Sequence, residues 1–115
     1  MATPEQRIKS MINRRLEPLI LDGKLWKFMP VQSMYGSAGL DYLLCVNSWF
    51  IAIEAKKEGK ISKRTGERLK SAKPTTRQEE TMRRIKKAGG LCFVVSDKSS
   101  LDKAMQRIMV LTRCE

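Results

Sequence analysis

The residues best suited to chemistry lie in one short stretch that holds an aspartate, a glutamate and a lysine. Asp41 lies in LDYLLCV, and Glu54 and Lys56 lie in WFIAIEAK. Paired carboxylates without a histidine or a thiolate beside them suit Mg²⁺ or Mn²⁺ better than zinc. Such an ion, next to a lysine, can polarise a phosphoryl oxygen and activate water. The stretch therefore indicates a site for a hard divalent cation.

The two apolar runs predict two antiparallel strands, Leu40–Val46 and Trp49–Lys56, which only two residues separate. A gap of this length is typical of a tight hairpin turn. With the two residues in the turn, Asp41 falls opposite Glu54 on one face of the sheet. Lys56 follows Glu54 by two residues and projects from the same face.

The face that carries the acid pair also carries apolar side chains, Leu43, Phe50 and Ala52. We therefore expect partial burial rather than a hairpin whose charges simply face water. Two carboxylates that face each other across strands repel by roughly 0.2–1 kcal/mol. Protonation of one carboxyl, a neighbouring lysine or a divalent cation could relieve the repulsion. The sequence supplies the lysine, Lys56, and leaves room for the cation.

Two further polar residues lie on the inner faces of predicted helices, and each has two interpretations. Glu5 precedes Ile8 by three residues, so it either faces the acid pair or is a first-turn acid that the helix dipole favours. Gln78 precedes Met82 by four residues. It either completes a capping box with Thr75 or reaches toward the hairpin site.

The composition fits one basic domain and excludes several kinds of chemistry. The chain has 115 residues, is 42% apolar and carries a net charge of +11. The lack of histidine excludes a Ser-His-Asp triad and a His-liganded zinc. Cys45, Cys92 and Cys114 form no zinc-site spacing and fit free thiols, the first two buried, in a reducing compartment. The charge makes nucleic acid the leading expected partner, with an anionic membrane surface second.

The hydrophobic pattern predicts a single α/β domain over residues 1–115, a mixed β-sheet flanked by helices. The first helix is expected at Pro4–Glu17, behind a capping box of Thr3 and Gln6, and it should stop near Pro18. The other expected elements are a strand at Lys24–Val31, a loop at Ser33–Gly39, a helix that Thr75 caps and Gly89-Gly90 ends, a buried strand at Leu91–Val95, and a last helix capped by Ser99 or Ser100. With the hairpin, the order is α-β-β-β-α-β-α.

A long basic segment, Lys57–Pro74, lies between the hairpin and the second helix. It holds seven Lys or Arg residues and two Glu, with little apolar periodicity. Loops of this length in a compact domain are usually functional or mobile. We expect phosphate-backbone contacts, which position DNA without reading its bases. The residues predicted to make them are Lys57, Lys60, Lys63, Arg64, Lys70 and Lys73.

The stretch GLDYLLCVNSWFIAIEAKK, followed by TTRQEETMRRIKKAGGLCFVV, resembles the VRR-Nuc family of the PD-(D/E)xK nuclease superfamily, in its short virus-type form. Asp41 and Glu54-Ala55-Lys56 match the D…ExK core of that superfamily. Leu40 stands where the family commonly has proline. The resemblance spans about residues 4 to 96. It implies a restriction-endonuclease-like fold and a metal-dependent, structure-selective DNA endonuclease related to Holliday-junction resolvases.

The resemblance also implies a role for each site residue. Mg²⁺ or Mn²⁺ would be held by Glu5, Asp41, Glu54 and the carbonyl of Ala55. Lys56 would be the catalytic lysine, and Gln78 would be the helix glutamine of the family. Because nearby carboxylates raise the pKa of a lysine, we favour an orienting and electrostatic role for Lys56 over that of a general base.

Branched or flapped duplex DNA, such as a Holliday junction, is the implied substrate, and symmetric cutting by a domain with one site predicts a homodimer. The alternatives are a non-catalytic basic DNA-binding protein on the same scaffold, an RNA-binding module and a ribonuclease. The seven aromatic residues are too scattered along the chain to predict a stacking platform. No apolar run is long enough for a membrane span, and the N-terminus has no signal core. These features predict a cytoplasmic protein, in the host cell if it is viral.

Overall fold

The computed structural model describes residues 3–30, 40–57, 64–67 and 73–113. Within them it places three helices and one four-stranded sheet of strand order β1-β2-β3-β4. The elements are α1 (Pro4–Leu21), β1 (Trp26–Phe28), β2 (Tyr42–Val46), β3 (Trp49–Ala55), α2 (Thr76–Lys87), β4 (Leu91–Val95) and α3 (Lys98–Thr112). The predicted element order and the mixed α/β class are confirmed.

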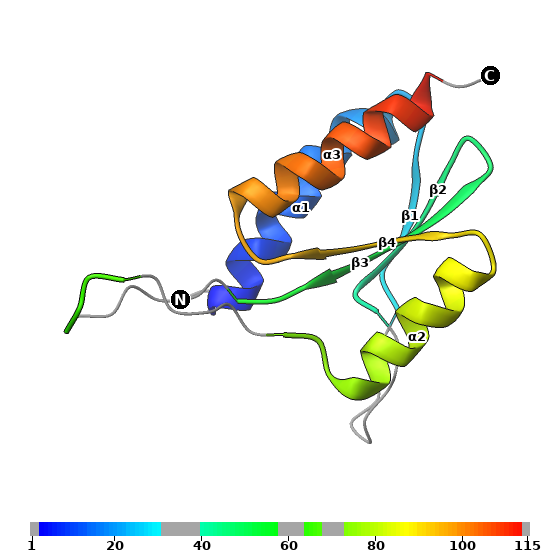
Figure 1. The fold of residues 1–115 in the computed structure, drawn as a ribbon. Helices are drawn as coiled ribbons and strands as arrows, with labels where there is room; N and C mark the ends of the chain where they lie inside the picture. The colour runs from blue at the N-terminus through cyan, green and yellow to red at the C-terminus, as the bar shows by residue number, and fades with distance from the viewer. Residues whose placement is uncertain (1–2, 31–39, 58–63, 68–72, 114–115) are drawn as a thin grey trace.

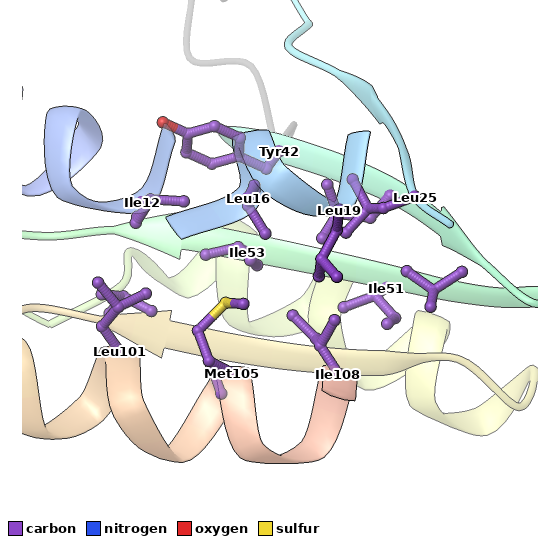
Figure 2. Packing of buried hydrophobic residues seen from close by; sticks show 14 of the residues in the cluster. Ile12, Leu16, Leu19, Leu25, Tyr42, Ile51, Ile53, Leu101, Met105 and Ile108 are labelled. Atoms are coloured by element: carbon purple, nitrogen blue, oxygen red, sulfur yellow. The ribbon is translucent and has the colours of Figure 1, made fainter. Parts of the chain in front are cut away.

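Helices cover both faces of the sheet, α1 and α3 on one face and α2 on the other (Figure 1). Strands β1, β2 and β3 pair antiparallel, and β4 runs parallel to β3 after the connection that contains α2. The main core lies between the sheet and the α1–α3 layer, where Leu16, Ile53 and Ile108 are fully buried (Figure 2). A smaller cluster of Leu40, Ala52 and Met82 lies under α2.

The hairpin of β2 and β3 has the predicted turn and register. Asn47 and Ser48 have φ values of 49° and 72°, the positive values that a type I′ turn requires at both positions. Val46 pairs with Trp49, and the ladder continues as far as Tyr42 and Ile53. Since Ile53 points into the main core, its neighbour Glu54 points to the opposite face, on the side of α2.

The prediction that the first helix stops near Pro18 is wrong, because α1 continues to Leu21 with Pro18 inside it. An internal proline costs about 3 kcal/mol of helix stability. Leu19 lies beyond it and is buried in the main core, and burial of a leucine side chain contributes about 1.5–3 kcal/mol. The carbonyls of Pro18 and Leu19 also accept the N–H groups of Asp22 and Lys24, which closes the last turn.

The two edge strands differ from their sequence predictions. β1 comprises only Trp26–Phe28 of the expected Lys24–Val31, the last residue of which lies outside the described part. β4 has the expected bounds, but only Val95 is fully buried, because the strand forms an edge of the sheet. The predicted loop Ser33–Gly39 lies outside the described residues.

Two local predictions also need correction. Asp97, rather than Ser99 or Ser100, caps α3, since its Oδ1 accepts the N–H of Ser100 at 2.7 Å. Cys45 and Cys92 are free thiols as expected, but Cys45 is exposed and Cys92 only half-buried. Cys45 is exposed because it does not belong to the apolar cluster that packs under α2.

In the described part of the chain, no helix combines the length and the apolar character that crossing a membrane requires.

Candidate functional site

Three carboxylates meet at one end of the sheet, where α1 begins, β2 begins and β3 ends. Glu5, Asp41 and Glu54 each offer an oxygen, and these oxygens all lie within 4.8 Å of one another. Asp41 and Glu54 are 7% and 2% exposed, whereas Glu5 is open to solvent. The structure therefore brings together the three acids that the sequence predicted as metal ligands. Of the two interpretations of Glu5, it favours the one that joins the acid pair.

Main-chain hydrogen bonds hold the two buried acids. The N–H of Asp41 donates to Oε2 of Glu54 at 3.3 Å, and the N–H of Ala55 donates to Oδ2 of Asp41 at 2.8 Å. The strand pairing thus continues past its last ladder pair through side chains, and Asp41 lies opposite Glu54 as predicted. Because the N–H and C=O of a strand residue point to the same side, the Ala55 carbonyl is directed toward Asp41 as well.

Lys56 lies against the acid pair, as the hairpin register predicted. Its Nζ lies 3.6 Å from Oε1 of Glu54, and its side chain is only 15% exposed. The N–H of Lys56 donates to the carbonyl of Val95 at 2.9 Å, which fixes the backbone of this residue to β4. The ammonium therefore has a defined place at the edge of the carboxylate cluster.

A second lysine, which the sequence analysis missed, lies on the other side of the cluster. Nζ of Lys9 is 3.3 Å from Oδ1 of Asp41 and 3.9 Å from Oε1 of Glu5. Lys9 follows Glu5 by four residues, and residues at that spacing share one face of a helix. That spacing is the signal that could have found it once Glu5 was assigned to the site.

Tyr42 ties α1 to the start of β2 beside the acids. Its hydroxyl donates to the carbonyl of Lys9 at 3.2 Å, and its ring is fully buried. Burial, and then the charge of Asp41, raise the pKa of Tyr42 to about 12, and a hydrogen bond with Asn13 opposes the rise. Tyr42 therefore stays protonated at physiological pH and acts as a donor that positions the first turns of α1.

Glu54 has the most perturbed acidity of the site. Burial, and then the hydrogen bond and charge of Asp41, raise the pKa of Glu54 to about 8, and the charge of Lys56 opposes the rise. The Glu54 carboxyl consequently holds a proton at neutral pH when no metal is bound. A cation in the cluster would compete with that proton, because ligands bind metals in their deprotonated form.

Gln78 takes the capping role that the sequence allowed. Its Oε1 accepts the N–H of Thr75 at 3.0 Å, while its own N–H donates to Oγ1 of Thr75 at 3.2 Å. Any contact with a substrate would therefore have to come from the Nε2 amide of Gln78.

Half of the predicted DNA-binding residues fall in the described part of the chain. Lys57, Arg64 and Lys73 are exposed. The other three, Lys60, Lys63 and Lys70, lie outside the described residues.

The donor set of the cluster is chemically suited to one kind of ligand. It comprises three carboxylates within reach of a single ion, with a backbone carbonyl directed the same way. Hard oxygen donors of this type select Mg²⁺, Mn²⁺ or Ca²⁺ over softer metals. The flanking ammonium of Lys56 adds a positive charge where an anionic substrate would approach.

No family model, no curated protein and no solved structure matches this chain.

Proposed function

We propose that the protein is a divalent-metal-dependent, structure-selective DNA endonuclease with a PD-(D/E)xK fold, of the VRR-Nuc type. The observation that carries the proposal is the cluster of Glu5, Asp41 and Glu54 oxygens within 4.8 Å, with the Lys56 ammonium beside it. The element order α-β-β-β-α-β-α is compatible with that fold. The net charge of +11 supports a polyanionic substrate.

The cluster would hold Mg²⁺ or Mn²⁺ through Glu5, Asp41, Glu54 and the Ala55 carbonyl. When bound, the ion polarises a phosphoryl oxygen and lowers the pKa of a bound water. Glu54 must release its proton for this, and the nearby Lys56 charge favours the ionised carboxylate. Asp41 keeps its orientation throughout, because its Oδ2 is held by the Ala55 N–H.

Lys56 would act on the substrate by charge. Its partly buried ammonium, 3.6 Å from Oε1 of Glu54, can stabilise the negative charge that develops on the phosphate during hydrolysis. A role as general base would require the neutral amine, and the adjacent Glu54 carboxylate disfavours it. Gln78 would contribute its Nε2 amide as a further hydrogen-bond donor.

The substrate is proposed to be branched or flapped duplex DNA, including four-way junctions. Exposed Lys57, Arg64 and Lys73 offer phosphate contacts that carry no sequence preference. Paired cuts in a junction would require two copies of this one-site domain, so a homodimer belongs to the proposal.

The direct test incubates labelled four-way junction, flap and linear duplex DNA with the protein in Mg²⁺, Mn²⁺ or EDTA. Asp41→Asn, Glu54→Gln and Lys56→Ala should each abolish cleavage and leave DNA binding intact. Asp102→Asn is the matched control, since Asp102 is a half-exposed acid that pairs with Arg15 outside the cluster. Cleavage that persists in EDTA would refute the metal assignment. If the wild-type protein cuts no DNA and the Asp41→Asn variant binds DNA as tightly as the wild type, the non-catalytic alternative is established.

A further inference from the structure

Exposed aromatic side chains gather on the sheet although they are far apart in the sequence. Trp26, Phe28 and Phe50 are 62%, 49% and 46% exposed. Trp26 pairs with Cys45, which in turn pairs with Phe50 on the next strand. Since directly paired residues project from the same face, Trp26 and Phe50 lie in one row across β1, β2 and β3. We call Trp26, Phe28 and Phe50 the aromatic surface.

Phe28 extends this row along β1. The rings of Trp26 and Phe28 stack with their centroids 6.0 Å apart and their planes 7° apart, so both rings have one orientation. Phe28 pairs with Leu43 of β2, and Leu43 is two residues from Asp41, which immediately precedes the strand. At about 3.4 Å per residue, the Phe28 row lies about 7 Å along the strands from Asp41.

The aromatic surface and the acid pair lie on the same face of the sheet. Phe50 and Glu54 are four residues apart on one course of β3, and side chains separated by an even number of residues share a face. The Trp26–Phe50 row is consequently about 14 Å along the strands from the acids.

Helix α2 borders the aromatic surface without covering it. Its apolar side chains pack on Ala52, and a groove of about 390 Å³ opens between the helix and Phe50. Thr81 and Arg84 line this groove together with Phe50, and Nε of Arg84 donates to Oε1 of Glu80 at 3.1 Å. A guanidinium beside an aromatic ring can hold a phosphate while a base packs on the ring.

We infer that the aromatic surface is a stacking site for unpaired nucleotides of a nucleic acid strand whose phosphate lies at the acid pair. The inference rests on the proposed function for its choice of ligand, and it adds that the substrate has a single-stranded arm next to the point of cleavage. Three features support nucleic acid over an apolar protein partner: the shared face with the acids, Arg84 in the bordering groove, and the charge of +11.

Tryptophan fluorescence tests the inference without any cleavage, in EDTA. The chain has two tryptophans, so Trp49→Phe leaves Trp26 as the only reporter. An oligothymidylate of about 12 nucleotides should quench Trp26, whereas an abasic strand of equal length and charge should not. The reciprocal variant Trp26→Phe leaves Trp49 as the only tryptophan. Trp49 precedes Phe50 in β3, so its side chain points to the face opposite the aromatic surface. The emission of Trp49 should therefore not depend on the bases.

Affinity measurements provide the second arm. Trp26→Ala and Phe28→Ala should each weaken binding of the oligothymidylate at least about fivefold and leave abasic-strand binding unchanged. Trp26→Leu and Phe28→Leu, which preserve apolar area, should show the same loss if an alanine variant fails to fold. Leu21→Ala is the control, because Leu21 is 80% exposed at the end of α1.

Several outcomes separate the alternatives. Equal quenching by the abasic strand would overturn the inference, because backbone contacts would then suffice. A Trp26 emission that shifts to the blue as the protein dimerises would overturn it too, since the surface would then join two copies. Preference for oligouridylate over oligothymidylate would assign the site to RNA and contradict the DNA substrate. Base-dependent quenching in a protein that cuts no DNA would refute the proposed function and support the stacking site.

Discussion

The backbone N–H of Asp41 lies 3.3 Å from Oε2 of Glu54, so the main chain of one acid holds the side chain of the other. Both side chains are buried. Protonation of one carboxyl, a neighbouring lysine or a bound cation can relieve their repulsion, and the structure has the first two. Glu54 holds a proton at neutral pH, and the ammonium groups of Lys9 and Lys56 lie at 3.3 and 3.6 Å from the pair. The third way, a bound cation, is the basis of the proposed function.

The raised pKa of Glu54 makes the stability of the metal-free protein depend on pH. The ordinary pKa is 4.5 and the folded value is about 8, so the folded state binds more protons than the unfolded state between these values. Stability is therefore full below about pH 4.5 and falls as the pH rises toward 8, by at most about 1.4 kcal/mol per pH unit. Urea denaturation in EDTA at several pH values measures the slope.

Glu54→Gln is the control for this slope, because glutamine does not titrate. The variant should be nearly insensitive to pH over the same range, since the chain has no histidine to titrate there. Mn²⁺ should stabilise the wild-type protein more at pH 8 than at pH 5.5, as metal and proton compete for one carboxyl. A wild-type slope that survives in Glu54→Gln would show that another group is responsible.

The sequence predicted the acid pair because its geometry is local. Two turn residues with left-handed backbone fix the register, and the register sets Asp41 opposite Glu54. Pro18 misled the prediction of α1, since the burial of Leu19 that offsets it depends on the tertiary structure. Lys9 and the row of Trp26 and Phe50 were missed for a similar reason, as their neighbours come from segments distant in the chain. The family assignment and the function remain predictions.

Lys9 should compete with a metal ion for the acids. Lys9→Met removes an ammonium 3.3 Å from Asp41, so we expect Mn²⁺ to bind up to about fivefold more tightly, the effect of a partly exposed ion pair. The same variant should melt at a lower temperature than the wild type in EDTA. Titration followed by electron paramagnetic resonance of free Mn²⁺ measures the affinity.

Lys24→Met is the matched variant for this experiment. Its Nζ lies 3.2 Å from Asp22 in an exposed pair outside the cluster, so Mn²⁺ affinity should stay at the wild-type value. Weaker Mn²⁺ binding by Lys9→Met would mean that Lys9 helps to hold the carboxylates for the metal ion and does not compete with it.

Gln78 and Thr75 share one capping box, which allows capping to be separated from catalysis. Gln78→Ala and Thr75→Ala should each cost about 1 kcal/mol of stability. Only Gln78→Ala removes the Nε2 amide, so it alone should lower the cleavage rate by about 10²-fold, the effect of losing one well-placed donor. Single-turnover cleavage, measured alongside thermal melts, compares the two. Equal rates for both variants would limit Gln78 to its helix cap.

Ser48→Gly should stabilise the protein without changing the site. Ser48 has a φ of 72°. This value is unfavourable for a residue with a Cβ atom, whereas glycine adopts it without strain. An Asn-Gly pair is also the preferred sequence of a type I′ turn, so we expect a gain of about 0.5–1 kcal/mol in urea denaturation. Asn47→Gly should gain less, because it loses the bond from Nδ2 of Asn47 to the Leu111 carbonyl. A loss of stability in Ser48→Gly would contradict the assigned turn.

The short turn between β2 and β3 also bears on the order in which the chain folds. A hairpin closes in about 1–10 μs, so Asp41 and Glu54 can meet early, from a local segment. Lys56 is fixed only when β4 docks, and that step must close a much longer loop. The hairpin therefore brings the two acids together before Lys56 is fixed beside them. At that stage, protonation of one carboxyl is what relieves their repulsion. Refolding should consequently be faster in mildly acidic than in mildly alkaline buffer.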